Sequence, residues 1–494
     1  MTPPARSGVA TQAPYPIGFS TKIGYYLAPL VLMTVDYVVI VAALLTAWFI
    51  RVSIVPQYFT SLMPFDIQGI LLYVVIPSNY ISFLAYEGLY SKRLPFWQCA
   101  EKVFKICTYV SLFAIMVMYF VGTAEQVSRL FVAFTWIISF VYLCIARYFV
   151  KKGLTATGLW QKPVVIVGAG KTAEILAQTF TDEPSMGYKI VGVVEDNLAE
   201  RPLVHRYPHI GTFATVEQAV KSSEVQDVII AAPGLQREEL LDLVYRIQPY
   251  VRNLTIVPDL FGVPLSNMSV ETLFNEKIVL LKSRNNLSLI RNFLIKRCFD
   301  IVAGSIICVM ILPILIVLAI KIKADSSGPI MHNAKRLGRN GQEFSCYKFR
   351  TMHVNGDSML QDYFKENPSA KEEWDKFAKL KDYDPRVTKA GMLLRRYSLD
   401  ELPQIINVLK GEMSLVGPRP YLPREKERMS YYANTILDTV PGITGLWQVS
   451  GRNEITFEGR LELDVWYVRN WSFWQDIVLL FKTIGVVMGR KGAY

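Results

Sequence analysis

Two adjacent carboxylates, Asp400 and Glu401, are the residues of this 494-residue chain best placed for catalysis. They stand in the run Ser398-Leu399-Asp400-Glu401-Leu402-Pro403, directly before an apolar stretch. The spacing Ser398-x-x-Glu401 is that of a capping box, so we expect the pair at the start of a helix that Gly411 ends. Backbone N–H groups at such a start attract phosphate. An aspartate can be the nucleophile of phosphoryl transfer, and a neighbouring carboxylate can bind Mg²⁺. The alternative is that Glu401 only caps the helix.

Basic residues stand on both sides of this pair in the sequence. The candidates for binding substrate phosphates are Lys348, Arg350, Arg386 and Arg419. Arginines in loops shaped by Gly and Pro suit bidentate phosphate contacts. A single arginine is more often solvated or ion-paired, but three around one acidic pair favour a phosphate site. The last of the four histidines is His353, so chemistry beyond that position does not use a histidine base.

Two further C-terminal segments stand out. The loop 441–452 is rich in small residues that let backbone approach a ligand closely. Aromatic residues crowd the chain from Trp466 onward, and apolar positions in 473–489 recur at helical spacing. An amphipathic helix at the membrane interface explains that segment, and so does a plain core helix.

The composition indicates a membrane protein. Hydrophobic residues make up 51% of the chain and charged residues 19%, and the apolar residues gather in blocks. Four blocks fall within residues 1–150, roughly at 28–50, 67–86, 104–122 and 129–148, each about the length that a spanning helix needs. Basic residues concentrate between the second and third blocks and after the fourth, which predicts that these links and everything after 150 are cytoplasmic.

The net charge of +11 fits an anionic lipid bilayer and phosphate-bearing substrates. We expect no nucleic-acid partner, because no basic stripe interleaved with aromatic residues marks a soluble module. The six cysteines are far apart and form no Cys-x-x-Cys, so we expect reduced thiols and neither disulfides nor zinc.

Residues 160–285 are expected to form a Rossmann-like α/β domain. Short apolar strands at 164–167, 190–194, 228–232 and 254–257 alternate with helical patterns. Gly168 and Gly170 follow the first strand in a Gly-x-Gly-x-x-Ala spacing, which is typical of a dinucleotide-binding loop, and Glu195 or Asp196 could hold a ribose. The alternative is that the glycines only allow tight packing between strand and helix.

A fifth apolar block, 301–320, has basic residues on both sides and Pro313 inside. Its length fits a full span, but positive charge at both ends places both ends in the cytoplasm. Proline removes a backbone donor and kinks a helix. We therefore expect a re-entrant membrane helix at 301–322 that enters one leaflet and returns, within a C-terminal domain at 290–494.

The C-terminal runs together resemble the polyprenyl-phosphate hexose-1-phosphate transferases, which are bacterial sugar transferases. The resemblance covers about 292–494 and rests on the runs KRCFD, RLGRNGQEF, CYKFRTM, DPRVT, YSLDELPQIINVLKGEMSLVGPRP and PGITGLWQVSGR. The chain departs from the family pattern at Leu312, where a serine usually precedes the hairpin proline, and at Lys335, where a glutamine is common.

The resemblance implies a UDP-hexose donor, undecaprenyl phosphate as acceptor, Mg²⁺ as cofactor and an α-rich catalytic domain. By resemblance Asp400 is the nucleophile that attacks the β-phosphate and releases UMP, and Glu401 binds Mg²⁺ or assists. Lys348, Arg350, Arg386 and Arg419 then hold phosphates.

The C-terminal end looks most like an undecaprenyl-phosphate galactose phosphotransferase that begins O-antigen, capsule or exopolysaccharide synthesis at the bacterial inner membrane. A glucose-1-phosphate transferase is the close rival. A non-catalytic membrane sensor or scaffold that binds a nucleotide is a third possibility, and a homodimer is compatible with the middle domain.

Overall fold

The computed structural model describes residues 11–59, 67–121, 128–198, 201–259, 268–273, 278–282, 286–368, 370–371, 380, 383–451 and 455–488. The chain divides into two compact units, Met1–Leu260 and Phe261–Tyr494, which are described separately.

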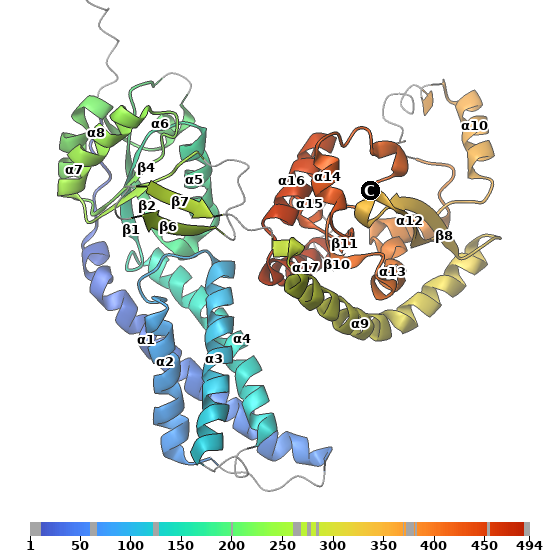
Figure 1. Cartoon of the computed structure of the whole chain (residues 1–494), viewed down its shortest axis with the longest axis horizontal. Coiled ribbons are helices and arrows are strands. Elements are labelled where there is room, and N and C mark those ends of the chain that lie inside the picture. Colours follow the sequence, from blue (N-terminus) through green and yellow to red (C-terminus); the bar gives the residue numbers. More distant parts are fainter. Residues whose placement is uncertain are drawn as a thin grey trace, which may run out of the picture. The chain divides into compact units, whose positions relative to one another are not determined.

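The first unit begins with a helical bundle, which Figure 1 shows as long helices side by side. Its helices are α1 (Phe19–Phe49), α2 (Ile76–Tyr86), α3 (Phe96–Val121) and α4 (Arg129–Ala156). Three apolar helices here are long enough to cross a membrane, at Ile23–Gln57, Phe96–Phe120 and Arg129–Ala156. The second predicted block gives a shorter apolar helix, Leu71–Tyr86, which begins as a π-helical turn before α2. Part of the link before it, 60–66, lies outside the described residues.

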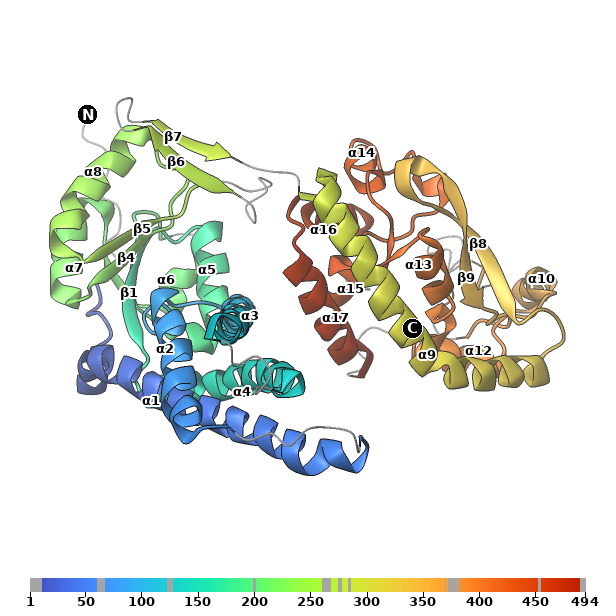
Figure 2. The same cartoon turned by 60° about the horizontal axis from the view of Figure 1, so that its bottom comes forward.

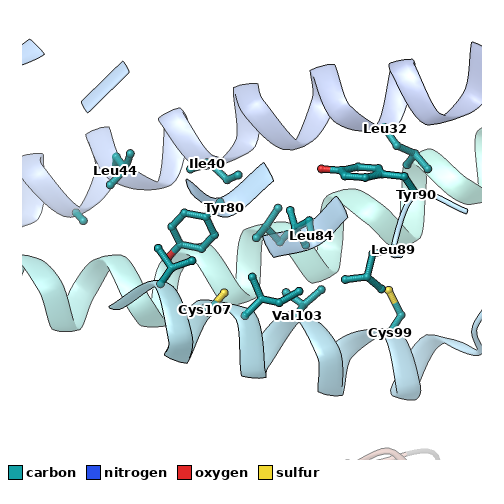
Figure 3. Close-up of a cluster of buried hydrophobic side chains, with 14 of the residues drawn as sticks. Leu32, Ile40, Leu44, Tyr80, Leu84, Leu89, Tyr90, Cys99, Val103 and Cys107 are labelled. Carbon is teal, nitrogen blue, oxygen red and sulfur yellow. The ribbon is translucent and has the colours of Figure 1, made fainter. Parts of the chain in front are cut away.

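Buried side chains recur every fourth residue on the faces where these helices meet, as the amphipathic pattern of a packed helix requires. Figure 3 shows this core, to which α1, α2, α3 and the link after α2 contribute Leu32, Ile40, Leu44, Tyr80, Leu84, Leu89, Tyr90, Cys99, Val103 and Cys107. One ion pair lies inside the bundle. Arg147 of α4 donates to both carboxylate oxygens of Asp36 of α1 at 3.0 and 2.5 Å, and both side chains are buried. A buried charge is stable only when paired in this way.

The bundle leads into a five-stranded parallel sheet with the order β3-β2-β1-β4-β5. The strands are β1 (Lys162–Val167), β2 (Tyr188–Val194), β3 (His209–Gly211), β4 (Asp227–Ile230) and β5 (Asn253–Ile256). The helices are α5 (Lys171–Asp182), α6 (Pro202–Arg206), α7 (Val216–Ser223) and α8 (Arg237–Ile247).

Side chains of β1 alternate between two hydrophobic clusters, with Val165 and Val167 in one and Val164 and Ile166 in the other. Both faces of the sheet are therefore covered, which explains the continuous apolar run. The predicted α/β sheet is confirmed, and only its short strand β3 went unpredicted. The sheet ends at Ile256, and residues from Phe261 onward, which the prediction had included up to 285, belong to the second unit.

The second unit is rich in helices. Its elements are β6 (Ser269–Leu273), β7 (Ile278–Lys282), α9 (Ile290–Asp325), β8 (Met331–Leu337), β9 (Glu343–Phe349), α10 (Gly356–Glu366), α12 (Lys389–Arg396), α13 (Gln404–Lys410), β10 (Ser414–Val416), α14 (Tyr432–Leu437), β11 (Gly442–Thr444), α15 (Leu446–Val449), α16 (Phe457–Arg469) and α17 (Phe473–Met488). β8 and β9 form an antiparallel hairpin, and β10 pairs in parallel with β11.

Helix α9 is the fourth helix of spanning length in the described chain. It is continuous over 36 residues with Pro313 inside, and Figures 1 and 2 show its ribbon changing direction about halfway along. Its first half packs into the core around β10 and α17 through Phe299, Ala303 and Ile307, and its second half packs near α12 through Leu318 and Ile322. The opposite face exposes large apolar side chains, among them Val302, Val309, Met310, Val317 and Ile320. One face of α9 thus lies on its own domain along its length and the other is apolar and uncovered.

A buried polar network attaches α9 to the domain. Lys296 Nζ lies 2.6 Å from Asp476 Oδ2 of α17 and donates to the carbonyl oxygen of Val416 at 2.8 Å. Tyr467 Oη and Trp471 Nε1 also donate to Asp476, at 2.7 and 3.0 Å. The charge of Asp476 is therefore fully paired, as its burial requires.

Candidate active site

Asp400 and Glu401 lie in one turn of 3₁₀ helix, Leu399–Glu401, between α12 and α13. Ser398 precedes this turn with φ 54° and makes no capping hydrogen bond through its side chain. The predicted capping box is therefore wrong, because Ser398 takes the left-handed conformation that turns the chain. The predicted helix end is confirmed, since α13 ends at Lys410 and Gly411 has φ 89°.

A lysine from the neighbouring hairpin meets this acidic pair. Lys348 of β9 donates to Glu401 Oε1 at 2.6 Å. Burial and then the charge of Glu401 raise the pKa of Asp400 to about 6, against the opposite effects of Lys348 and Arg395. Asp400 is consequently ionised at neutral pH but less tightly solvated than a surface aspartate, which suits a nucleophilic carboxylate.

Arg395, near the end of α12, is the arginine whose charge acts directly on Asp400. Burial lowers the pKa of Arg395, and the charges of Asp400 and Asp384 oppose that effect. Its Nε donates to Thr351 Oγ1 at 3.0 Å, which fixes the side chain. Sequence reasoning missed Arg395, although it stands only a few residues before the acidic pair.

The structure directs two of the four predicted phosphate ligands elsewhere. Arg350 is buried, and its terminal nitrogens donate to the carbonyl oxygens of Ser326 and Ser327 at 2.7 and 2.8 Å. Those residues directly follow α9, so Arg350 satisfies carbonyl groups at the helix end that have no partner within the helix. Arg386 forms a bidentate pair with Asp384 inside its own turn, at 2.7 to 3.2 Å. In this structure Arg350 and Arg386 thus hold internal partners, and their roles as phosphate ligands stay predictions.

A second group of cations surrounds Trp447. The guanidinium carbons of Arg419 and Arg460 lie 5.6 and 5.1 Å from the centre of its ring. Burial and then the charge of Arg419 lower the pKa of Arg460. The same two causes lower the pKa of Arg336 of β8, on which Glu401 also acts. Arg336 is thus close to both the acidic pair and the Arg419 group, and these like charges are held where an anion would stabilise them.

Asp464 of α16 holds the loop that presents Arg419. It is fully buried and accepts hydrogen bonds from the backbone N–H of Arg419 at 3.1 Å and from Tyr421 Oη at 2.9 Å. Burial raises the pKa of Asp464 to about 7, although both hydrogen bonds favour the ionised form. The sequence did not single out Asp464, because an acid inside a helical pattern reads as a solvent-facing residue.

The predicted small-residue loop carries Trp447 and begins with β11, whose Gly442 pairs with Ser414. A Cβ at Gly442 would lie 2.0 Å from the backbone nitrogen of Gly417, so this loop packs backbone to backbone against the Arg419 loop. Arg452, at the end of the predicted motif, lies outside the described residues.

The donor set at the acidic pair fits Mg²⁺ better than a transition metal. The described residues include no group of three or more His, Cys, Asp and Glu side chains that could hold a metal ion. Mg²⁺ is commonly held by one or two carboxylates together with substrate phosphates and water. Asp400 and Glu401 supply two carboxylates, and Lys348 occupies only one oxygen of Glu401.

The predicted dinucleotide loop of the α/β domain has an internal occupant. Glu195 is buried, and its carboxylate accepts from the backbone N–H groups of Ala169, Asp196 and Asn197 at 2.7, 3.0 and 3.1 Å. Gly168 has φ +99°, and a Cβ there would lie 2.8 Å from the carbonyl oxygen of Ala231. Glu195 is therefore not positioned to hold a ribose, and Gly168 serves close packing. A Cβ at Gly170 would meet no tight contact.

Comparison with known proteins gives two family matches. Residues 291–490 match the bacterial sugar transferase family, and residues 87–258 match a CoA-binding domain family. The chain is 36% identical over 406 residues to the undecaprenyl-phosphate galactose phosphotransferase of Salmonella typhimurium, covering 82% of this chain and 84% of that protein. It is 31% identical over 403 residues to the UDP-glucose:undecaprenyl-phosphate glucose-1-phosphate transferase of Xanthomonas campestris pv. campestris, covering 78% and 79%.

A shorter relative, the exopolysaccharide production protein ExoY of Sinorhizobium fredii, is 46% identical over 199 residues. That similarity covers 40% of this chain and 88% of the relative.

Proposed function

The chain belongs to the bacterial sugar transferase family, and we propose that it transfers galactose 1-phosphate from UDP-galactose to undecaprenyl phosphate, releasing UMP. It is a membrane phosphoglycosyl transferase of polysaccharide synthesis. The observation that carries the proposed mechanism is the setting of Asp400, a half-buried carboxylate beside Glu401 and among the cations Lys348 and Arg395.

In the proposed first step an oxygen of Asp400 attacks the β-phosphorus of UDP-galactose. The bond between that phosphorus and the bridging oxygen breaks, and UMP leaves with the electron pair. In the second step an oxygen of undecaprenyl phosphate attacks the aspartyl phosphosugar, the bond to Asp400 breaks, and galactosyl-diphosphate-undecaprenol forms. Two sequential displacements predict ping-pong kinetics. Asp400 returns as a carboxylate, so the cycle needs no histidine base.

The cations supply the electrostatic part of catalysis. Negative charge accumulates on the diphosphate as UMP leaves, and fixed guanidinium groups stabilise it without reorganisation. Lys348 and then Arg395 are the cations whose charges act on Asp400, whereas Arg419 and Arg460 lie beside Trp447 and Arg336 interacts with Arg419 through its charge. We assign Arg395 to the transferred phosphate and the Trp447 group to the UMP moiety. Mg²⁺ held by Asp400 and Glu401 would add charge neutralisation at the same phosphates.

Helix α9 supports the cytoplasmic placement of this site. The catalytic domain packs along one face of α9 in both of its halves. A full span would bury about 20 residues in hydrocarbon, where a polar domain could not accompany them. We therefore propose that α9 enters and leaves the cytoplasmic leaflet of the inner membrane with its exposed apolar face toward lipid.

The choice of galactose as the transferred sugar is based on the Salmonella relative and needs a direct test. The full-length protein in detergent, with Mg²⁺ and undecaprenyl phosphate, is assayed for UMP release from UDP-galactose and UDP-glucose. UDP-galactose should give the higher kcat/KM, and Asp400→Asn should abolish release. Asp362→Asn, an exposed carboxylate on α10, serves as the matched control.

The Xanthomonas relative points to glucose. A higher kcat/KM with UDP-glucose would therefore replace galactose by glucose as the proposed sugar. Absence of UMP release from every UDP-hexose would favour the sensor or scaffold and contradict the proposal.

A further inference from the structure

A cleft of about 780 Å³ lies within the N-terminal unit, away from the residues assigned to sugar transfer. Its walls are the start of α1, the link between α2 and α3, and the N-terminal ends of β1, β4 and β5. Gly168 and Glu195 follow the C-terminal ends of β1 and β2, so the cleft is at the other edge of the sheet from the predicted dinucleotide loop. Its volume is within the range of small-molecule sites.

Arg93 is the first charged group of this cleft. Its Nη1 donates to the carbonyl oxygen of Trp160 at 2.9 Å, and its guanidinium lies 3.4 Å from the centre of the Trp160 ring. Trp160 is itself fixed, because it is buried and its Nε1 donates to the carbonyl oxygen of Ser185 at 2.8 Å. Burial lowers the pKa of Arg93 to about 10. Within the part of the chain that is described, Arg93 contacts no carboxylate.

Arg252, just before β5, is the second charged group of this cleft. It donates to Tyr25 Oη at 2.8 Å, and its guanidinium lies 5.5 Å from the centre of the Tyr25 ring. No acidic partner of Arg252 occurs among the residues with a described position. The third cation of the cleft differs, since Lys162 lies 2.7 Å from Asp227 and is neutralised there. Asp227 and Glu224 also line the cleft, and the charge of Asp227 acts on Arg93. Among the described residues, however, neither carboxylate forms an ion pair with Arg93 or Arg252, so both guanidinium groups keep N–H donors for a ligand.

We propose that this cleft binds a phosphate group, carried either by the headgroup of a membrane lipid or by a soluble phosphate ester. Guanidinium groups with free N–H donors bind phosphate oxygens in bidentate fashion. Tyr25 and Tyr26, which are exposed, offer aromatic surface in the same cleft. The cleft also includes the first turns of the first apolar helix, where tyrosines are typical of the headgroup layer.

A ligand there would join the membrane bundle to the α/β domain. Arg93 belongs to the link between two membrane helices, and Arg252 to the sheet. The wall around α1 is closely packed, because a Cβ at Gly24 would lie 2.0 Å from the carbonyl oxygen of Leu159. Binding would therefore stabilise this junction without reshaping it, and would give the α/β domain a ligand that the Glu195-filled loop does not provide.

The test uses full-length protein in nanodiscs and follows thermal unfolding. One arm adds phosphatidic acid to phosphatidylcholine nanodiscs, and the other adds glycerol 3-phosphate to nanodiscs of phosphatidylcholine alone. A ligand that binds only the folded state raises Tm with its concentration. Arg93→Gln and Arg252→Gln should each weaken the apparent affinity about tenfold, the typical effect of losing one charge-assisted hydrogen bond.

Arg237→Gln, an exposed arginine on α8, is the control and should respond like the wild type. Stabilisation by phosphatidic acid alone identifies a lipid headgroup, and stabilisation by both probes identifies a site open to soluble esters. Arg252 is exposed, so its variant keeps the fold even where Arg93→Gln does not. Failure of both probes to raise Tm, or equal stabilisation of Arg252→Gln and wild type, would overturn the proposal.

Discussion

Asp464 gives the sharpest test of how the active-site loop is held. Asp464→Asn keeps the shape of the side chain and an oxygen that can accept from the Arg419 N–H and Tyr421 Oη, but removes the ionisation. The pKa of Asp464 is raised from 3.8 to about 7 in the folded chain. The folded state therefore retains a proton that the unfolded state has lost, and wild-type stability falls as pH rises through this window.

The size of the effect follows from the shift. At 1.36 kcal/mol per pKa unit, ionising the buried carboxylate costs the folded wild type about 4 kcal/mol. For a unit of this size that corresponds to a change in Tm of about 10 °C between about pH 4 and pH 8. Asp464→Asn should lose this dependence, so the wild type should be the less stable of the two at alkaline pH. Asp464→Ala leaves both donors unpaired and should be destabilised at every pH by about 2 to 5 kcal/mol.

Thermal unfolding of the full-length protein across this pH range, recorded for all three proteins, provides the measurement. Parallel pH profiles of wild type and Asp464→Asn would refute the idea that Asp464 is the titrating group.

Two further substitutions separate structural from catalytic roles. Lys296→Met leaves Asp476 buried without its cation and should destabilise the C-terminal unit by about 3 to 5 kcal/mol. The double variant Lys296→Met with Asp476→Asn should recover most of that loss in thermal unfolding. Equal destabilisation of the single and the double variant would show that the ion pair is not the cause. Lys348→Met removes a partly exposed pair with Glu401 that is worth at most about 1 kcal/mol, so Tm should change little. Its kcat for UMP release should nevertheless fall about 100-fold, and unchanged turnover would remove Lys348 from the active site.

Four of the five strands in the α/β sheet could be predicted, because each of the four is a short apolar run bounded by turn residues, which is a local signal. The role of Gly168 could not be predicted from the sequence. Whether a glycine loop accepts a ligand depends on what fills it, and the occupant, Glu195, comes from the next strand and turns inward. The Gly-x-Gly spacing is the same in a loop that binds a ligand and in a loop that a side chain of the protein fills.

The acidic pair could be named from the sequence, but its basic partners could be named only in part. Lys348 contacts Glu401 and Arg419 lies beside Trp447, whereas Arg350 donates to carbonyl oxygens after the end of α9. The acceptor that an arginine binds depends on which carboxylates and carbonyl groups lie near it in the folded chain, and several such acceptors compete for each arginine. Arg395 and Arg336 approach the pair only after α12 and the β8–β9 hairpin have packed.

The central claim is that Asp400 carries the sugar phosphate, and trapping tests it most directly. Full-length protein is incubated with UDP-galactose and Mg²⁺ without undecaprenyl phosphate, digested, and analysed by mass spectrometry. We predict a hexose phosphate on the peptide at Asp400, with one UMP released per adduct, and loss of the adduct when undecaprenyl phosphate is added. Release of UMP only in the presence of undecaprenyl phosphate, with an unmodified Asp400 throughout, would contradict the claim.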